Sequence, residues 1–395
     1  MNDLTHYETP LQQTPFHART AAANRLNNWG AWAGYTTSLC YGDDAMEYTA
    51  IRNTASIYDL CPMVKYRITG PDAAVYLNRL TVRNAAKLKV GSVHYTVWCD
   101  DAGHALDDGT LFRHGAEEYL LCCQERHLPW LLDSAIGHAV HVREVTEDIA
   151  ALSLQGPCTA TVLANAGFDV GSLKPFRMAA FAFNNRELII SRTGFTGDLW
   201  YELWTTPDCA LALWDALMAA GAYCGIRPIG TNALNLARIE AGFIITNMDF
   251  IAADQAVRED RVCSPFELTL DWMIDWGKGN FTGRCALMAE RDKGTSQWAL
   301  VGLDVDGNVS AEGSLIYHNK RTEVGYITAA AWSPSTKRNI AIAQIKRLYQ
   351  KGDNLWAEIY ALRELQYIKL MLRVVPTGRP FFAPARRRAT PPEVF

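Results

Sequence analysis

Residues 63–80 read MVKYRITGPDAAVYLNRL and combine two periodicities of apolar residues. Val64, Tyr66 and Ile68 alternate with polar residues, which is the period of two expected of a half-buried strand. The Gly-Pro-Asp that follows provides a flexible entry, a proline suited to the first helical position and an acid near the positive end of a helix. Apolar residues then recur at helical spacing over 73–80. The stretch therefore predicts a strand, a turn and a helix in direct succession.

The same pattern returns in the middle of the chain. Leu152 and Leu154 lead into Gly156-Pro157, and apolar residues follow at helical spacing over 162–166. Two such units with further strands between them favour an α+β body made of two related halves. A Gly-Pro helix start also recurs in chains without any duplication, so both interpretations stand at this point.

The character of the sequence changes toward its end. Helices are expected over 206–221 and 231–240, each ended by a glycine. Past about residue 280 short strands and turns predominate, with Asp306-Gly307 expected as a hairpin turn and Val324-Gly325-Tyr326 inside a strand. We predict an α+β region over 1–280 formed by two interleaved subdomains, a β-rich domain over 281–380 and a tail over 381–395.

The composition excludes several classes of partner. The chain has 395 residues, 49% hydrophobic and 20% charged, as an ordinary globular protein has. Because the formal net charge is −4, we expect no nucleic acid or membrane partner, and we interpret Arg386-Arg387-Arg388 as a solvated tail. Ten scattered cysteines without a C-x-x-C pair favour reduced thiols and a cytoplasmic location. No leader peptide or long apolar segment is evident, so we expect neither export nor membrane insertion.

The commonest catalytic signatures are missing from the sequence. The chain lacks the glycine-rich dinucleotide and phosphate loops, the H-E-x-x-H zinc motif and the G-x-S-x-G nucleophile elbow. His138 and His141 have no third ligand nearby, and the acidic run at 304–308 lacks the glycine and glutamate of a calcium loop. We therefore expect no metal site.

Two adjacent carboxylates, Asp107 and Asp108, mark the first candidate site. They lie in the segment ALDDGTLFR at 105–113, which reads as a strand. Neighbouring strand residues face opposite sides, so one carboxylate can point into a cleft while the other caps a turn or faces solvent. The alternative is a polar hairpin with an Asp-Gly turn.

Glu202 marks the second candidate site. It follows the run ISRTGFTGD at 190–198 and shares a strand face with Trp200 and Trp204. A carboxylate among aromatic rings needs hydrogen-bond donors if that face is buried. A pterin offers two parallel donors and a ring that stacks on an aromatic face. The alternative is an edge strand with a solvated glutamate.

Several blocks together resemble the glycine cleavage T-protein, or aminomethyltransferase, family, which includes folate-dependent demethylases. The serine-arginine-threonine-glycine block is the most specific, and the matches keep the family order from about residue 35 to 350. The matching blocks are Tyr41-Gly42 with Glu47 and Arg52, Ile57-Tyr58-Asp59-Leu60 with Met63, Gly70-Pro71-Asp72-Ala73, Ala105-Leu106-Asp107-Asp108, Leu154-Gln155-Gly156-Pro157, residues 190–197, residues 237–242, Phe281-Thr282-Gly283-Arg284 and Trp332-Ser333-Pro334.

The resemblance implies an architecture and a set of site residues. It implies a ring of three subdomains, with duplicated α+β halves and a C-terminal β-barrel domain, around a central opening that holds tetrahydrofolate. It places Asp107 at the position of the catalytic aspartate. The residues implied to bind the cofactor are Glu202, Tyr95, Trp200, Arg238 and Arg363, the last by a loose alignment.

Departures from the family pattern bear on the donor. Leu234-Asn235 replaces an Arg-Asp pair, Cys61-Pro62 replaces Ser-His, and residues 198–200 replace a more acidic, glycine-rich run. We expect tetrahydrofolate-dependent transfer of a methyl or methylene unit from a small methylated or aminomethylated donor, with a lipoyl carrier or an oxidoreductase chain as a partner to consider. The alternatives are a folate-binding assembly or repair factor without transfer activity, and a structural protein whose site has decayed.

Overall fold

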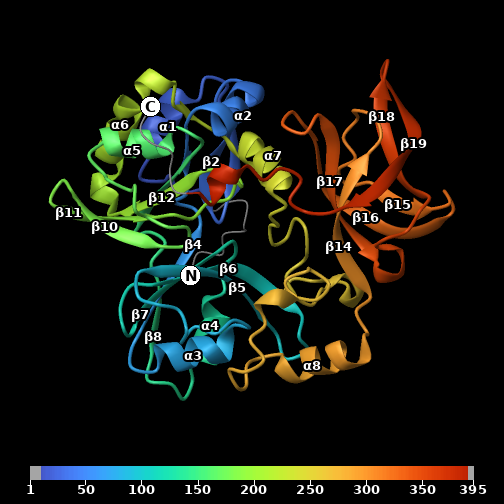
Figure 1. The fold of residues 1–395 in the computed structure, drawn as a ribbon, viewed down its shortest axis with the longest axis horizontal. Helices are drawn as coiled ribbons and strands as arrows, with labels where there is room; N and C mark the ends of the chain where they lie inside the picture. The colour runs from blue at the N-terminus through green and yellow to red at the C-terminus, as the bar shows by residue number, and fades with distance from the viewer. Residues whose placement is uncertain (1–9, 390–395) are drawn as a thin grey trace.

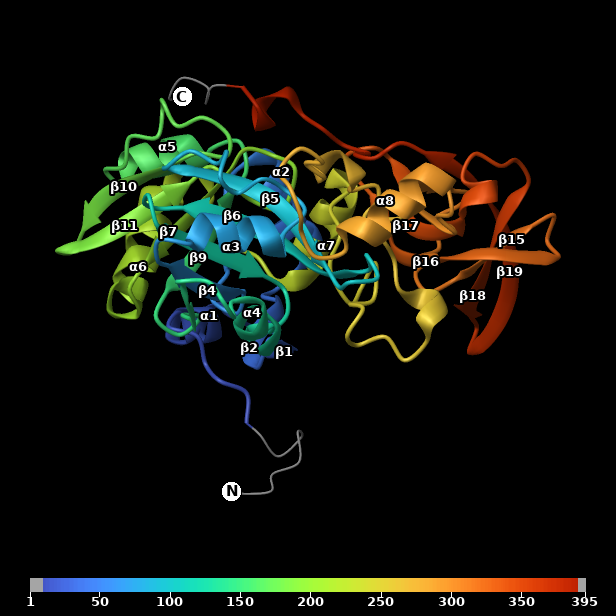
Figure 2. The same cartoon turned by 90° about the horizontal axis from the view of Figure 1, so that it is seen from below.

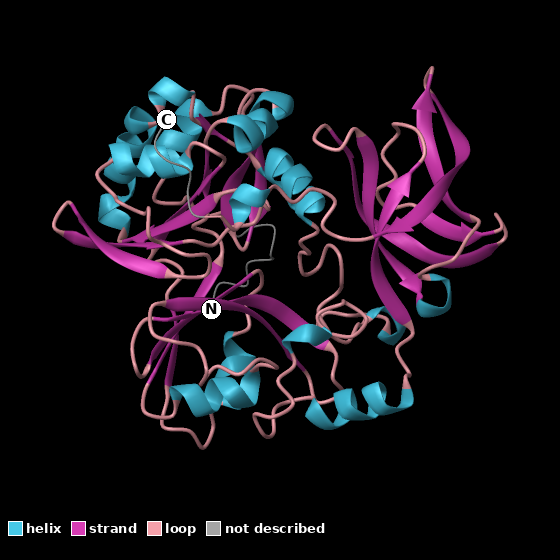
Figure 3. Cartoon of the chain, viewed as in Figure 1, coloured by secondary structure: helices cyan, strands magenta, loops and turns pink. Residues whose placement is uncertain are grey.

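The computed structural model describes residues 10–389, apart from the side chains of Glu259 and Arg363. Three bodies surround the middle of the molecule: two α+β parts and a barrel that consists mostly of strands (Figures 1 and 3). The resemblance implied this arrangement, in which two α+β parts and a C-terminal barrel form a ring of three subdomains.

The first α+β part contains the predicted strand, turn and helix, and further strands pair with that strand to form a sheet. Strand β4 and helix α3 follow the predicted bounds, since the strand begins at Val64 and the helix ends at Leu80. The sheet has the order β5-β6-β7-β4-β8, so β5 forms one edge. Its elements are β4 (Val64–Thr69), α3 (Ala73–Leu80), β5 (Ser92–Cys99), β6 (Ala105–Arg113), β7 (Glu118–Cys123), α4 (Leu128–Ser134) and β8 (His141–Glu144).

The second part has the same succession of elements, which supports the duplication. Its sheet has the order β10-β11-β12-β9-β3-β13, which matches the first sheet except that β3 (Ser56–Asp59) is inserted from the N-terminal segment. The two halves are interleaved for that reason. The elements are β9 (Ala150–Gln155), α5 (Thr159–Asn165), β10 (Met178–Phe183), β11 (Arg186–Ser191), β12 (Trp200–Thr205), α6 (Ala210–Ala220) and β13 (Arg227–Pro228).

The glycines of the two Gly-Pro turns occupy equivalent and crowded positions. Gly70 has φ +130° and Gly156 has φ +121°, a region that residues with a Cβ rarely adopt. A Cβ would lie 2.5 Å from the carbonyl oxygen of Ala139 at the first turn and 2.6 Å from that of Thr54 at the second. Both turns therefore require glycine.

The remaining helices and strands before the barrel pack against the second part or lie at the centre of the molecule. Helix α7 lies between the α+β parts and the barrel (Figure 1), and Gly242 ends it in the left-handed conformation, as predicted. These elements are α1 (His17–Ala23), β1 (Asn28–Trp32), β2 (Tyr35–Cys40), α2 (Asp44–Asn53) and α7 (Thr231–Ala241), and α8 (Arg284–Lys293) leads to the barrel.

The barrel is closed by six strands in the order β14-β17-β16-β15-β18-β19. Residues 324–326 lie inside β16, as predicted, but the predicted hairpin at Asp306-Gly307 is wrong. Strand β14 pairs with β17 and β19 and thereby closes the barrel, so the turn leads into a longer connection before β15. The strands are β14 (Trp298–Val305), β15 (Leu315–His318), β16 (Thr322–Ser333), β17 (Arg338–Lys346), β18 (Leu355–Arg363) and β19 (Gln366–Thr377).

The chain after the barrel returns to the second α+β part, as Figure 2 shows. We name residues 378–389 the C-terminal strap. Arg386 forms an ion pair with the fully buried Asp198, and buried Arg192 donates to the carbonyl oxygen of Ala389. The interpretation of residues 386–388 as a solvated tail is therefore wrong for Arg386, since a buried carboxylate needs a cationic partner. Arg388 is exposed.

Two further predictions concern the state of the cysteines and the presence of membrane-spanning segments. All ten cysteines are free thiols. Among the described residues, no helix combines the length and the apolar character needed to cross a membrane.

Candidate active site

The register of the first sheet shows which residues face the second sheet. Tyr95 on β5 pairs with Thr110 on β6, and Val97 pairs with Asp108, so these four side chains share one face. On the same face, the Phe112 ring lies 5.1 Å from the Trp204 ring of β12 between their centroids. The space between the two sheets is therefore lined by residues of both halves.

Asp108 faces this space. Its Oδ2 accepts a 2.6 Å hydrogen bond from the Tyr95 hydroxyl, and its Oδ1 accepts a 2.9 Å bond from the Thr246 hydroxyl. Burial, and then the neighbouring charge of Asp107, raise the pKa of Asp108 to about 7. Burial and Asp108 also raise the pKa of Tyr95 above its usual value. A carboxyl group that titrates near neutral pH can exchange a proton with a reacting group.

Asp107, the expected catalytic aspartate, lies on the opposite face of the sheet. It pairs with Trp98, is fully buried, and accepts from the backbone N–H groups of Asp108 (2.8 Å) and Glu125 (3.0 Å). The Thr246 hydroxyl and the His127 ring, at 2.5 and 3.1 Å, complete its partners. The two aspartates therefore have different surroundings: Asp107 is enclosed by four hydrogen-bond partners on one face of the sheet, and Asp108 lies on the face toward the second sheet.

Glu202 lies on β12, directly between its neighbours β9 and β11, so the edge-strand alternative is excluded. It is only 8% exposed, and the Thr193 hydroxyl donates to its Oε2. Its Oε1 has no partner among the described residues. Burial raises the pKa of Glu202 to about 7. One oxygen of the carboxylate thus has a hydrogen-bond donor and the other does not. The carboxylate would accept the adjacent N–H donors of a bound heterocycle.

Trp200 shares the strand face of Glu202 and is buried against the preceding loop. A Cβ on Gly194 would lie 2.7 Å from the Trp200 Cβ, which explains the glycine in the SRTG block. The Trp200 indole nitrogen is buried and has no partner among the described residues. This unpaired donor fits a site that a ligand completes.

The resemblance predicts that Arg238 contacts the cofactor, but in the structure its guanidinium donates to groups of the protein. The side chain is fully buried and forms an ion pair with Asp249, a 2.7 Å bond to Asn235 Oδ1 and a 3.1 Å bond to the Phe243 carbonyl. Asp249 also accepts from Ile245 N and Thr328 Oγ1. Arg238 therefore fixes the loop that carries Thr246 to the aspartate pair.

Three residues near the aspartates were missed from the sequence. Thr246 and Asp249 lie in a loop without a motif, and His127 precedes α4 as a lone histidine. A lone histidine or threonine carries no signal until the fold brings it to a carboxylate. Arg363 ends β18, and its side chain lies outside the described residues, so its expected contact with folate stays a prediction.

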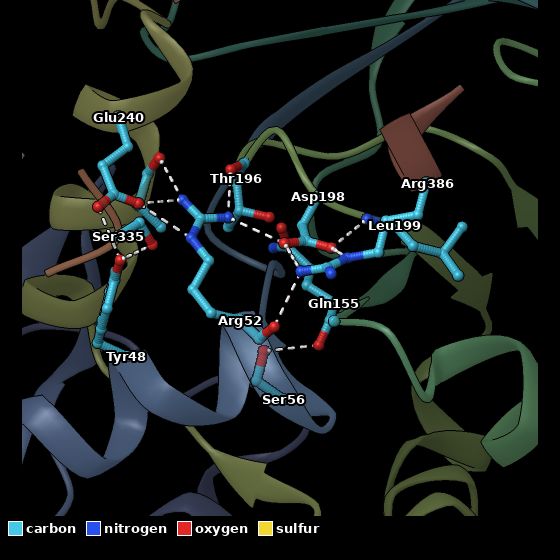
Figure 4. A network of polar contacts seen from close by, with 12 residues as sticks. Tyr48, Arg52, Ser56, Gln155, Thr196, Asp198, Leu199, Glu240, Ser335 and Arg386 are labelled. Carbon is cyan, nitrogen blue, oxygen red and sulfur yellow. Dashed lines mark hydrogen bonds and ion pairs between the residues drawn. The ribbon is translucent and has the colours of Figure 1, made fainter. Parts of the chain in front are cut away.

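A buried ionic network joins three parts of the chain next to this site (Figure 4). Arg52 on α2 donates to Glu240 Oε2 at 2.6 and 2.9 Å and to Asp198 Oδ2 at 3.3 Å. Ser333 of the barrel donates to Glu240 at 2.5 Å, and Arg386 of the strap holds Asp198. The positive charges of Arg52 and Arg386 balance the negative charges of Glu240 and Asp198, as buried charges require.

A separate group of potential metal ligands has a structural explanation. Cys40, Asp44 and Glu47 lie close together. However, Glu47 accepts from the backbone N–H groups of Tyr41 and Gly42 through Oε1, and from that of Gly230 through Oε2. The glutamate holds the start of α2 against the start of α7.

Comparison with known proteins agrees with this architecture. The family model described as "GCVT N-terminal domain" matches residues 15–278, and "Glycine cleavage T-protein C-terminal barrel domain" matches residues 299–374. The chain therefore belongs to the glycine cleavage T-protein family. Among solved structures, the aminomethyltransferase T of Bartonella henselae has the same fold, with a TM-score of 0.83 and 22% identity over 96% of this chain and 99% of that chain.

Two curated relatives show the range of names within the family. An aminomethyltransferase of Halothermothrix orenii is 29% identical over 342 residues, which are 85% of this chain and 92% of that protein. A trimethylamine-oxide aldolase of Ruegeria pomeroyi is 32% identical over 350 residues, which are 85% of this chain but 43% of that longer protein.

Proposed function

We propose that this protein transfers a one-carbon unit from a small methylated or aminomethylated amine to tetrahydrofolate. The observation that carries the proposal is the opposition of two carboxyl groups across the two sheets. Half-satisfied Glu202 faces the interior from β12, and Asp108 with its Tyr95 partner faces it from β6. Family membership supports folate as the acceptor.

Glu202 and its neighbours fit the pterin end of tetrahydrofolate. Oε1 is free to accept, Thr193 fixes Oε2, and Trp200 and Trp204 lie on the same strand face. Two parallel charge-assisted hydrogen bonds to a carboxylate orient a planar ring as well as bind it. Tetrahydrofolate, when bound, supplies the nucleophilic amine that accepts the one-carbon unit.

Asp108 fits the role of proton acceptor in this scheme. Its pKa near 7 allows it to take a proton as the acceptor amine forms its new bond, and to return one to the departing amine. Thr246 and Tyr95 hold the carboxylate in one orientation. Asp107 contributes by its charge, which raises the pKa of Asp108, and by fixing Thr246. Positioning of donor and acceptor supplies much of the rate.

The names of the relatives favour a nitrogen-linked donor. Aminomethyltransferases and a trimethylamine-oxide aldolase both have donors whose carbon is bound to nitrogen. A donor at the oxidation level of formaldehyde gives methylene-folate without an oxidant. A simple methylamine gives methyl-folate without an oxidant, and it requires an oxidoreductase partner only if the product is methylene-folate. A lipoyl carrier stays a prediction.

The test is product formation with defined donors under anaerobic conditions. The protein is incubated with tetrahydrofolate and trimethylamine N-oxide, or with an aminomethyl donor, and methylene- and methyl-folate are measured by chromatography. We expect folate product that depends on Asp108 and is lost in Asp108→Asn. Folate that binds without product from any donor would favour a non-catalytic folate-binding factor.

A further inference from the structure

The loop that joins β11 to β12 carries the hydrogen-bond partner of Glu202. It spans residues 192–199, contains neither helix nor strand, and includes Thr193, whose hydroxyl donates to Glu202 Oε2. The loop is nonetheless buried, since Thr193, Thr196 and Asp198 are each at most 3% exposed. Because the loop lies outside the ladders of both sheets, side chains from other segments satisfy its polar groups and hold it in place.

Asp198 anchors this loop through two arginines from distant parts of the chain. Arg386 of the C-terminal strap forms the closer pair, with its Nε 2.5 Å from Oδ1 and its Nη2 2.8 Å from Oδ2. Arg52 Nη1 lies 3.3 Å from Oδ2, while the Nε and Nη2 of Arg52 donate to Glu240. Without Arg386, one arginine would therefore serve two fully buried carboxylates.

The strap is itself fixed on both sides of this ion pair. The backbone N–H groups of Phe381 and Phe382 donate to the Glu240 carbonyl oxygen at 2.9 Å. The Phe382 ring centroid lies 4.9 Å from Cζ of Arg52. Arg386 Nη2 also donates to the Arg52 carbonyl oxygen at 2.9 Å (Figure 4). The guanidinium of Arg386 is therefore held in one orientation.

We infer that Arg386 is a positioning residue for the folate site, because it holds the loop that orients Glu202. A bidentate ion pair fixes the direction of a carboxylate as well as its distance. Asp198 and Thr193 belong to the same short loop, so release of Asp198 would shift the Thr193 hydroxyl. Glu202 would then lose the donor that holds its Oε2. This inference rests on the proposed function, in which Glu202 binds the pterin.

Anaerobic calorimetry of tetrahydrofolate measures the contribution of Arg386 in the intact protein. We expect Arg386→Gln to weaken binding by about tenfold, which corresponds to one lost charge-assisted hydrogen bond in the site. Arg386→Lys keeps the positive charge but replaces the fork of donors by one ammonium group, so it should lose only about threefold. Arg388→Gln, at an exposed arginine two positions later, is the matched control and should bind as the wild type does.

A double-mutant cycle with Thr193→Val separates positioning from a general loss of stability. The valine keeps the shape of the side chain and removes the donor to Glu202. If Arg386 acts through this donor, Arg386→Gln should weaken binding little further in the Thr193→Val background. The double variant should then lose about tenfold rather than about a hundredfold. A loss of stability alone would act equally in both backgrounds.

Each contrary outcome has a distinct meaning. Absence of tetrahydrofolate binding to the wild type would refute the proposed function itself. Wild-type affinity in Arg386→Gln, or an equal loss in Arg388→Gln, would overturn the role of Arg386 alone. Losses that multiply in the double variant would place the effect of Arg386 outside this loop and would also overturn the inference. If Arg386→Gln does not fold, Arg386→Lys takes its place in the cycle, and wild-type affinity in that variant would overturn the inference.

Discussion

The Tyr95 hydroxyl donates a 2.6 Å hydrogen bond to Oδ2 of Asp108 across the adjacent strands β5 and β6. Thr246 holds the other oxygen of the same carboxylate, while Asp107 is turned to the opposite face of the sheet. The two adjacent aspartates therefore have different surroundings, and the roles that we propose for them can be separated by substitution.

Asp108→Asn should lower turnover by about 10²- to 10⁴-fold, because it removes the proton acceptor while keeping the shape of the side chain. Folate affinity, measured by calorimetry, should change much less than the rate. Asp254→Asn, at a partly exposed carboxylate 3.7 Å from His127, is the matched control and should keep most of the activity. Turnover that survives Asp108→Asn would remove Asp108 from the catalytic step.

Asp107→Asn should act mainly on stability. The carboxylate is fully buried and accepts four hydrogen bonds, and an amide cannot accept from all four donors. Unpaired buried donors cost about 1–3 kcal/mol each, so urea unfolding should show a clear loss. Unchanged stability with abolished turnover would return the catalytic role to Asp107.

Folate binding should weaken as the pH falls from 8 to 6. The folded pKa of Glu202, about 7, lies above the usual value of a glutamate, so the group takes up a proton within this range and then accepts fewer hydrogen bonds. The expected loss of affinity is about tenfold per pH unit below the pKa. The dependence should persist in Asp108→Asn and disappear in Glu202→Gln. A flat profile in the wild type would argue against an ionised Glu202 as the ligand partner.

Arg52→Ala should destabilise the protein by about 3–5 kcal/mol, because it leaves the buried carboxylates Glu240 and Asp198 short of their cation. Arg143→Ala removes one partner of the exposed pair with Asp148 and should cost less than about 1 kcal/mol. Equal midpoints of urea unfolding for the two variants would contradict the importance of the network.

Gly156→Ala should destabilise the protein by more than about 1 kcal/mol, because its backbone conformation and the carbonyl oxygen of Thr54 both oppose a Cβ. Gly42→Ala is the matched control, since a Cβ there would meet no atom within 4 Å. Thermal unfolding compares the two variants. Similar behaviour would mean that the turn relaxes at little cost.

Much of the fold could be predicted because it depends on local patterns. The alternation in 64–69 and the Gly-Pro turns predicted both strand, turn and helix units. The hairpin at Asp306-Gly307 could not be judged locally, because closure of the barrel decides which strands pair. The prediction of a solvated tail was wrong for Arg386 for a similar reason. Its buried partner, Asp198, lies in a distant segment, so the local sequence gives no sign of the contact.

The candidate site was predicted only in outline. Glu202 and the aspartate pair have sequence signals, but the side that each aspartate faces depends on the register of β5 and β6. Arg238 is in a matching block, yet its role follows from Asp249, which lies eleven positions later in a loop without a motif. Contacts between distant segments decide such roles.

We propose that tetrahydrofolate binds between the two sheets with Glu202 as its pterin partner. The most direct measurement is anaerobic calorimetry of tetrahydrofolate with the wild type, Glu202→Gln and the control Glu187→Gln, an exposed carboxylate on β11. We predict one binding site in the wild type, a loss of affinity of about 10- to 100-fold in Glu202→Gln and no change in the control. Absence of binding to the wild type, or equal affinity in Glu202→Gln, would contradict the account.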